Sequence, residues 1–135
     1  LPKEVETNYH AYKKSLQSPQ PFYIDQPKVE GKKLILKWLP SYDFNNQQIT
    51  YHVELAKDPS FKEKILDKKE ISELSIETDR LPKGQYFIRV FAKNETGNSQ
   101  AAFDYYRTDT TKEFGVSGFY VMEDGGIKVD TYENR

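Results

Sequence analysis

The sequence predicts an all-β fold, an antiparallel β-sandwich made of short strands. Apolar and polar residues alternate with a period of two in several segments, turn residues separate these segments, and no long helical period lies between them. The chain has 135 residues, which is the size of one domain with short additional segments. Aromatic residues make up 14% of it, so we expect a small core rich in rings.

Residues 1–20 are expected to be a leader or linker in front of the sandwich. Tyr9, Tyr12 and Leu16 have the spacing of one face of a short helix, and Pro19 ends it. The expected structure is therefore a short helix that leads into a stiff linker.

The first two expected strands, at 34–38 and 49–56, follow a period of two. Their apolar faces carry Leu34, Leu36 and Trp38, and then Tyr51, Val53 and Leu55. Pro40 ends the first strand, and a polar loop leads into the second. Strands with this pattern place one face on the core and leave the other face toward solvent.

The middle of the chain is expected to form the margin of a sheet. The stretch from Lys64 to Lys69 mixes lysines with carboxylates, a pattern that protects an edge strand from pairing with another chain. A short alternation at 74–78 follows and places Ile76 toward the core.

The strongest alternation runs from residue 81 to residue 99. One face carries Tyr86, Ile88, Val90 and Ala92, and the other carries Phe87, Arg89, Phe91 and Lys93. A last strand is expected at 99–106. Residues 107–135 are expected to be a C-terminal extension with a hairpin, in which Gly125 and Gly126 turn between 119–122 and 127–129.

A spaced set of residues resembles the fibronectin type III family over about residues 21–106. Trp38 followed by Pro40 is similar to the tryptophan of the family's second strand, and Leu81-x-x-Gly84-x-Tyr86 is similar to its tyrosine corner. The resemblance implies a seven-stranded fibronectin type III or immunoglobulin-like sandwich. The expected core residues are Leu34, Leu36, Trp38, Tyr51, Val53, Leu55, Ile76, Leu81, Tyr86, Ile88, Val90 and Ala92.

A narrower resemblance rests on three motifs, Ser41-Tyr42-Asp43-Phe44, Asp58-Pro59-Ser60-Phe61 and Leu81-Pro82-x-Gly84-x-Tyr86. They are similar to the accessory module that follows the kinase-like domain in proteins of the spore coat protein H (CotH) family. The resemblance implies a parent protein of a spore-forming Gram-positive bacterium, with all kinase residues upstream of Leu1. Because Leu1 is not methionine, we also expect a fragment or a processed form.

Composition excludes several classes of function. The chain has no cysteine, which excludes disulfides, thiolate catalysis and cysteine-bound metals. Twenty basic and twenty-one acidic residues give a net charge of −1, so the overall charge does not attract nucleic acid or an anionic membrane. No apolar run reaches the length of a membrane helix. We therefore expect no nucleic-acid partner and no membrane insertion.

The sequence assigns no residue to catalysis, to a cofactor or to a metal. His10 lies in the polar leader, and His52 lies on a strand face that points away from the core, so neither has an evident nucleophile beside it. The carboxylates are interleaved with lysines, as on a solvated edge. We therefore expect that the chain is not an enzyme, and catalysis by a carboxylate pair is the last-ranked hypothesis.

Two loops carry formal binding motifs for which a structural interpretation is favoured. The loop Asp43–Gln48 alternates like the start of a calcium loop, and Glu54 falls at its twelfth position, but Gln48 stands where such a loop needs glycine. Asn94-Glu95-Thr96 is formally a glycosylation sequon. Asparagine followed by Gly97 also suits a tight turn, so the turn is the favoured reading.

One surface is expected to have a functional role. If alternate residues of the strand at 86–93 face the core, then Phe87 and Phe91 face outward. The predicted interaction face consists of Phe87, Arg89, Phe91, His52 and Glu54. Two explanations of the outward rings stay open. Either the leader or the tail from Phe114 to Tyr132 covers them, which the apolar residues of the tail favour, or they dock a partner domain or a glycan.

The leading functional hypothesis is a non-catalytic spacer or protein-interaction module of a larger secreted, cell-surface or spore-coat protein. Its partner would be another protein or a neighbouring domain of the same chain. The alternative is a carbohydrate-binding module, which needs exposed rings that stack on sugars. The candidate rings are Tyr42, Phe44, Phe87 and Phe91.

Overall fold

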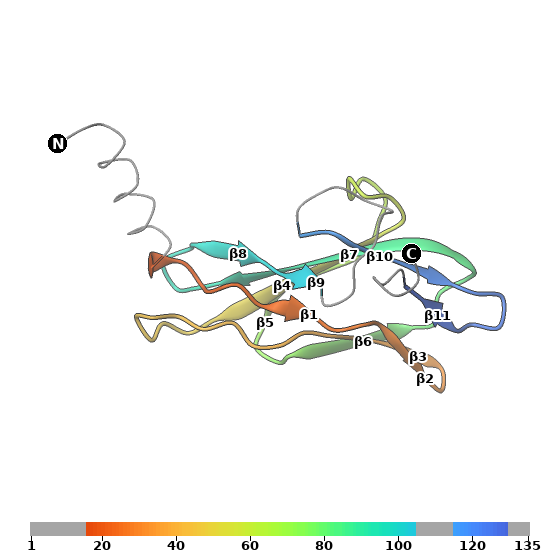
Figure 1. Cartoon of the computed structure of the whole chain (residues 1–135), viewed down its shortest axis with the longest axis horizontal. Helices are drawn as coiled ribbons and strands as arrows, with labels where there is room; N and C mark the ends of the chain where they lie inside the picture. Colours follow the sequence, from red (N-terminus) through yellow and green to blue (C-terminus); the bar gives the residue numbers. More distant parts are fainter. Residues whose placement is uncertain (1–15, 105–114, 130–135) are drawn as a thin grey trace.

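The computed structural model describes residues 16–104 and 115–129 and confirms an all-β sandwich (Figure 1). The predicted N-terminal helix, with Tyr9 and Tyr12, lies outside these residues. Within the described ranges, no helix has both the length and the apolar composition to cross a membrane.

The smaller sheet covers one side of the core. Its strands, in spatial order, are β2 (Lys28–Glu30), β3 (Lys33–Lys37) and β6 (Ser75–Asp79). All neighbours in this sheet are antiparallel. Alternation along β3 turns Leu34 and Leu36 inward, as the sequence predicts, and leaves Lys33 and Lys37 exposed.

The larger sheet is built around β7 (Gly84–Lys93). On one side of β7 lie β4 (Thr50–Ala56) and then β5 (Lys64–Ile71); on the other lie β8 (Ser99–Ala101), β10 (Ser117–Val121) and then β11 (Ile127–Lys128). The predicted hairpin near the C-terminus is confirmed, because Tyr120 pairs with Lys128 across β10 and β11. Since β10 is hydrogen-bonded to β7, this hairpin belongs to the sheet.

Two short strands connect the sheets along one side of the sandwich. They are β1 (Tyr23–Ile24) and β9 (Phe103–Asp104), which pair in parallel. Ile24 also forms an antiparallel bridge with Trp38 at the end of β3. Through these two contacts, β1 connects the smaller sheet to β9, which follows β8 in the chain.

The last strand of the sandwich is split. The strand β8 pairs with the C-terminal part of β7, the chain then crosses to β1, and β10 returns to pair with the N-terminal part of β7. Gly115 lies where the chain comes back. A Cβ at this glycine would stand 2.8 Å from the Cβ of Ala101, and its φ of +76° favours glycine, so a larger residue would disturb this return.

The edge strand β5 contains two bulges. Its register against β4 shifts between Tyr51 and Val53, where Lys69 and Glu70 both stand opposite His52. It shifts again near its start, where Ile65 is the additional residue. Glu70 has a φ of +56°, as expected for a bulge residue. Together with its lysines, these irregularities protect β5 against pairing with another chain.

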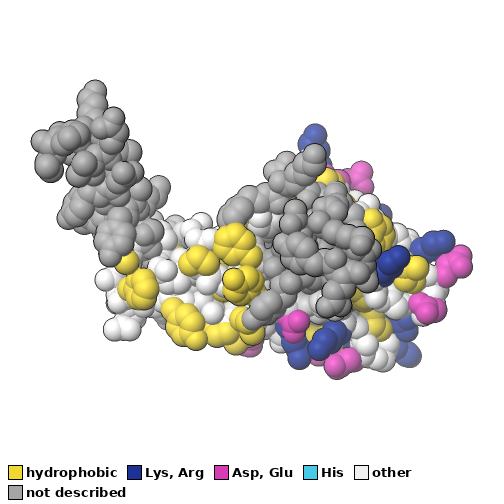
Figure 2. Space-filling view, in the orientation of Figure 1, with side chains coloured by type: hydrophobic (Ala, Val, Ile, Leu, Met, Phe, Trp, Pro, Cys, Tyr) yellow, Lys and Arg dark blue, Asp and Glu magenta, His cyan; other side chains and the backbone are white. Residues whose placement is uncertain are grey.

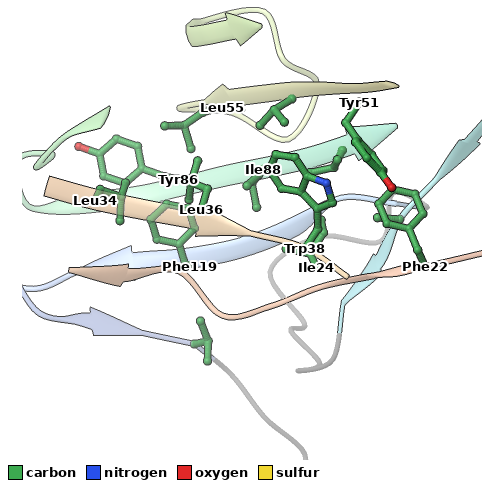
Figure 3. Close-up of a cluster of buried hydrophobic side chains, with 14 of the residues drawn as sticks. Phe22, Ile24, Leu34, Leu36, Trp38, Tyr51, Leu55, Tyr86, Ile88 and Phe119 are labelled. Atoms are coloured by element: carbon green, nitrogen blue, oxygen red, sulfur yellow. The ribbon is translucent and has the colours of Figure 1, made fainter. Parts of the chain in front are cut away.

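The main core lies between the two sheets, and its prediction is confirmed (Figure 3). Ten predicted core residues are buried, and Ile76 and Leu81 are partly buried against them. The buried set contains Leu34, Leu36, Trp38, Tyr51, Val53, Leu55, Tyr86, Ile88, Val90 and Ala92. The tyrosine corner is also present, because the Tyr86 hydroxyl donates a hydrogen bond of 2.6 Å to the Pro82 carbonyl.

The hairpin at the C-terminus supplies part of this core. Phe119 and Val121 were expected among the tail residues that could cover the outer face, but they are buried between the sheets. The Phe119 ring stacks on the Tyr86 ring with centroids 5.8 Å apart, in the same buried cluster as Leu36 (Figure 3). Phe119 points inward because its partner across the strands is Tyr86, which also faces the core.

Replacing Phe119 tests whether this hairpin contributes to the stability of the sandwich. Phe119→Ala should lower the free energy of unfolding by about 3 kcal/mol or more, since it removes a fully buried ring from the core. Met122→Ala on the same hairpin is the control, because Met122 is 43% exposed. Chemical denaturation measures both. Equal small losses would show that the hairpin folds apart from the sandwich.

Candidate functional site

The five residues of the predicted interaction face lie together on the outer face of β4 and β7. Their cross-strand pairs are His52 with Phe91 and Glu54 with Arg89, while Ala56 stands opposite Phe87. The structure therefore brings together the residues that the sequence placed on one face. Their role in binding a partner stays a prediction.

Glu54 is the centre of a network of charges on this face. Its side chain is buried, and both carboxylate oxygens accept hydrogen bonds from Arg89, over 3.0 Å from Nε and 3.2 Å from Nη2. Lys64 on β5 places its ammonium 2.6 Å from Oε2 of the same carboxylate. A buried carboxylate needs such partners, because burial without them would be costly.

These contacts control the ionisation of Glu54. Burial alone raises the pKa of its carboxyl, but the hydrogen bonds from Arg89 and Lys64 outweigh burial and hold the pKa below its usual value. Glu54 therefore stays ionised at neutral pH.

His52 and Asp67 extend the network across the edge of the sheet. His52 Nε2 lies 2.6 Å from Asp67 Oδ1, and Lys64 Nζ lies 3.2 Å from Asp67 Oδ2. The hydrogen bond from His52 is the largest influence on the pKa of the Asp67 carboxyl; together with the hydrogen bond from Lys64 it outweighs desolvation and lowers that pKa. Lys64 therefore contacts both carboxylates and links β5 to β4.

The sequence did not predict that Lys64 and Asp67 belong to this site. Both lie in the stretch interpreted as a solvated edge, and the alternation of that stretch is weak. The bulges set which residues of β5 stand beside Glu54 and His52, and no turn residue marks them in the sequence. The one available signal was the opposite charge of residues on these two neighbouring strands, which could have suggested that Lys64 pairs with Glu54.

Phe87 is buried, which agrees with the favoured explanation that other residues cover this outward-facing ring. It does lie on the outer face, but Phe61 and Val116 cover it. These residues form a second apolar cluster, the outer cluster, which consists of Ala56, Phe61, Phe87 and Val116. Val116 belongs to the tail that was expected to cover this face. Phe114 lies outside the described residues.

The loop between β4 and β5 holds Phe61 over the outer cluster. Asp58 fixes this loop, because its carboxylate accepts hydrogen bonds from the backbone N–H groups of Glu63 and Lys62, and these bonds lower the pKa of the Asp58 carboxyl. Phe61 has a φ of +55°, which is a strained backbone conformation for an aromatic residue. Its burial offsets that strain.

Phe91 is half-buried and packs within the network. The Arg89 guanidinium lies 4.1 Å from the Phe61 ring centroid and 5.5 Å from that of Phe91. The His52 ring lies 6.0 Å from Phe91. Arg89 thus bonds Glu54 with its edge while it stacks between aromatic rings, an arrangement that the planar guanidinium favours.

The network does not fit a metal ion. His52, Glu54 and Asp67 offer ligand atoms within 4.8 Å of one another. However, Lys64 lies between the two carboxylates and Arg89 uses both oxygens of Glu54. Lys64 and Arg89 therefore occupy the positions where a metal ion would bind the carboxylates, and the ion would have to displace them.

The loops at one end of the sandwich are fixed by hydrogen bonds. Asp43 Oδ1 accepts from the Asn45 N–H, and Asp43 Oδ2 accepts from Asn94 Nδ2. Glu54 lies on the outer face of β4 with Arg89, so the side chains of the calcium motif do not meet. Asn94 is buried, and its amide also donates to the Gln17 carbonyl, which supports the turn interpretation over glycosylation.

We call this part of the molecule the loop end, defined by residues 16–20, 39–49 and 94–98. It contains no lysine or arginine, and its charged residues are Asp43 and Glu95. Figure 2 shows hydrophobic side chains on the left half of the molecule and charged side chains mainly at the right and lower right. Protein interfaces are likewise depleted in lysine and enriched in aromatic residues.

Two rings stand out from the loop end. Tyr42 is 68% exposed and Phe44 is 62% exposed, more than any other large hydrophobic residue in the described ranges. Asp43 lies between them and is held by Asn45 and Asn94. The loop therefore presents both rings on a fixed backbone, so that a partner would not have to order it.

Comparison with known proteins agrees with the fold. No protein-family model matches the chain, and no curated protein matches it significantly. The chain is similar to the solution structure of the fibronectin type III domain of human fibronectin type III domain containing protein 3. The two are 20% identical with a TM-score of 0.50, over 76% of this chain and 85% of that one.

Two further structures are similar to this chain. A structure described as FN3tt mut is 23% identical, covers 64% of this chain and 90% of that one, and has a TM-score of 0.39. The twitchin kinase region from C. elegans is 21% identical with a TM-score of 0.44, and the match covers 82% of this chain but 20% of that one. The match to the human domain supports a fibronectin type III-like sandwich.

Neutralising Glu54 tests the charge network. Glu54→Gln should lower the free energy of unfolding by roughly 2 kcal/mol, because Arg89 and Lys64 both lose their negatively charged partner. The loss stays moderate because Glu54 is buried but both cations are partly exposed to solvent. Asp79→Asn is the matched control, since Asp79 pairs with Lys33 on the exposed surface. We expect less than about 0.5 kcal/mol there. Equal losses in chemical denaturation would contradict a special role of Glu54.

The same network predicts the direction of the pH dependence. In the folded protein, the pKa values of Glu54 and Asp67 lie below their ordinary values of 4.5 and 3.8. The stability that these carboxylates contribute is complete above the ordinary values and is lost as the pH falls through the lower folded values. Urea denaturation at a series of pH values measures this. Below about pH 4.5, the free energy of unfolding should fall less with decreasing pH in Glu54→Gln than in the native chain. Parallel curves would contradict this assignment.

Proposed function

We propose that this chain is a non-catalytic fibronectin type III-like accessory module, and that its loop end docks on a protein partner or a neighbouring domain. The observation that carries the proposal is the fixed exposure of Tyr42 and Phe44 among loop-end residues of the described chain that include no lysine or arginine. Rigid rings of this kind provide large contact area at low entropic cost. Few charges there would have to be desolvated.

The chemistry of the outer face favours a non-catalytic role. In the described part of the chain, His52 is hydrogen-bonded to Asp67, and Glu54 is bonded to Arg89 and Lys64. The opposite charges neutralise one another within the network. Its contacts resemble a structural clamp between strands more than a base poised beside a nucleophile.

The parent protein that we propose is a secreted, cell-surface or spore-coat protein of the spore coat protein H type. This step rests on the resemblance of the motifs around Tyr42, Phe61 and Tyr86. Residues 16–20 belong to the loop end, so the chain enters the described part of the module at the end that carries Tyr42 and Phe44. An accessory module of this kind would position the preceding domain.

Carbohydrate binding is the second candidate. Asn45, Asn46, Gln47 and Gln48 follow the exposed Phe44, and amide side chains beside a ring suit the hydroxyl groups of a sugar. The four-ring platform expected from the sequence does not form, because Phe87 is buried and Phe91 packs on Arg89. Only Tyr42 and Phe44 are left for this role.

Identification of the partner, followed by a double substitution, distinguishes these functions. First, the native protein is captured from its source with an antibody raised against residues 21–106, and its partners are cross-linked. Mass spectrometry then determines the cross-linked sites and the intact mass. We expect cross-links at the loop end to a preceding domain or to a bound protein. The variant Tyr42→Ser with Phe44→Ser should then bind the identified partner at least tenfold more weakly, since two large rings are removed from the contact.

The control is Met122→Ser, which removes a hydrophobic side chain that is 43% exposed outside the loop end. It should leave the affinity unchanged. Equal affinity of the double variant and the control would reject the loop end as the docking surface. A glycan array tests the second candidate: binding that disappears in the double variant would replace the protein partner by a sugar.

A further inference from the structure

We infer that β6 is a docking edge for an extended segment of a partner protein, which would add to the smaller sheet as a strand with outward-facing basic side chains. This surface is separate from the loop end. Within the described ranges, β6 is hydrogen-bonded to β3 on one side only, and its other side forms the edge of the sheet. An unpaired edge is a template for strand addition.

The hydrogen-bond pattern shows which backbone groups are available. The Trp38 N–H donates to the Leu74 carbonyl, and the Arg80 N–H donates to the Lys32 carbonyl. Because bonding alternates along an antiparallel pair, the even-numbered residues bond to β3 and the odd-numbered residues of β6 direct their N–H and C=O groups to the open side. These odd-numbered residues are Ser75, Glu77 and Asp79.

The two edge strands on this side of the sandwich differ sharply. The strand β5 has two bulges and carries Lys64, Lys68 and Lys69, all of which hinder pairing. The strand β6 keeps an unbroken register with β3 over its five residues and contains no lysine, proline or glycine. The fold therefore protects one edge and leaves the other regular.

The charge of β6 selects the partner. Glu77 and Asp79 lie on its exposed, outward face, where Asp79 also pairs with Lys33 of β3, and Glu73 precedes the strand. A second copy of this chain pairing edge to edge would bring acidic residues opposite acidic residues, which is unfavourable. A strand with lysine or arginine at alternate positions would instead place opposite charges side by side.

A groove next to the end of β6 suits the inward side chains of the same strand. Its volume is about 470 Å³, and Ile65, Leu81, Pro82 and Tyr86 supply apolar atoms to its wall. Lys57 and Lys83 also line it, so it suits apolar side chains of the added strand and not its basic ones. The bulge near the start of β5 contributes Ile65, which is 38% exposed. An apolar residue that alternates with the basic ones would face this groove, because side chains of a strand alternate between faces.

Hydrogen exchange on the intact chain tests the inference. The probe is a short peptide with blocked ends that alternates lysine with valine, and the comparison peptide alternates glutamate with valine. The lysine peptide should slow amide exchange of Ser75, Glu77 and Asp79, and it should bind more tightly than the glutamate peptide. Nuclear magnetic resonance measures both.

Two substitutions at Glu77 provide the controls. Glu77→Pro removes an N–H that faces the open side but no bond to β3, so the fold should persist and the protection should disappear. Glu77→Lys should weaken binding of the lysine peptide roughly fivefold and strengthen binding of the glutamate peptide. This second variant tests the inference even if Glu77→Pro does not fold. The inference is overturned by unchanged exchange at these amides, by protection that persists in a folded Glu77→Pro, or by self-association through β6.

Discussion

The structure depends on β7, a strand of ten residues that has neighbouring strands on both sides. On one side β4 follows it through seven residues, and on the other β10 and β8 divide its length between them. Alternation then gives the strand two tasks. Ile88 and Val90 fill the main core, while Phe87 and Arg89 organise the outer cluster and the charge network. A change of register by one residue would exchange these faces and put Arg89 in the core.

Much of the sandwich could be predicted because alternation is a local signal. It identified the inward residues of β3, β4 and β7, and the spacing of Leu81, Gly84 and Tyr86 identified the tyrosine corner. The role of Phe119 could not be read from its own segment, because it depends on which strand its hairpin joins. The burial of Phe87 likewise depends on Phe61. The positive φ of Phe61 could not be predicted from any pattern in the sequence.

The candidate sites show the same division between local and long-range information. The proximity of His52 and Glu54 to Arg89 followed from placing two regular strands side by side, and it could be predicted. The addition of Lys64 and Asp67 required the bulges of β5, which shift register without a glycine to mark them. The loop end was missed for another reason: its segments are far apart in sequence, and their common lack of lysine and arginine becomes visible only once Asn94 joins them.

The split last strand has a consequence for how this domain can change over evolution. The chain leaves the sheet after Ala101 and returns at Gly115, so close by that a Cβ on the glycine would touch the alanine. Because the exit and the return nearly coincide, the length of chain between Asp104 and Gly115 is not fixed by the sheet. For flexible loops in general, doubling the length costs only about 0.6 kcal/mol of closure entropy. Related chains could therefore carry inserted segments of very different size at this point and keep the same sandwich.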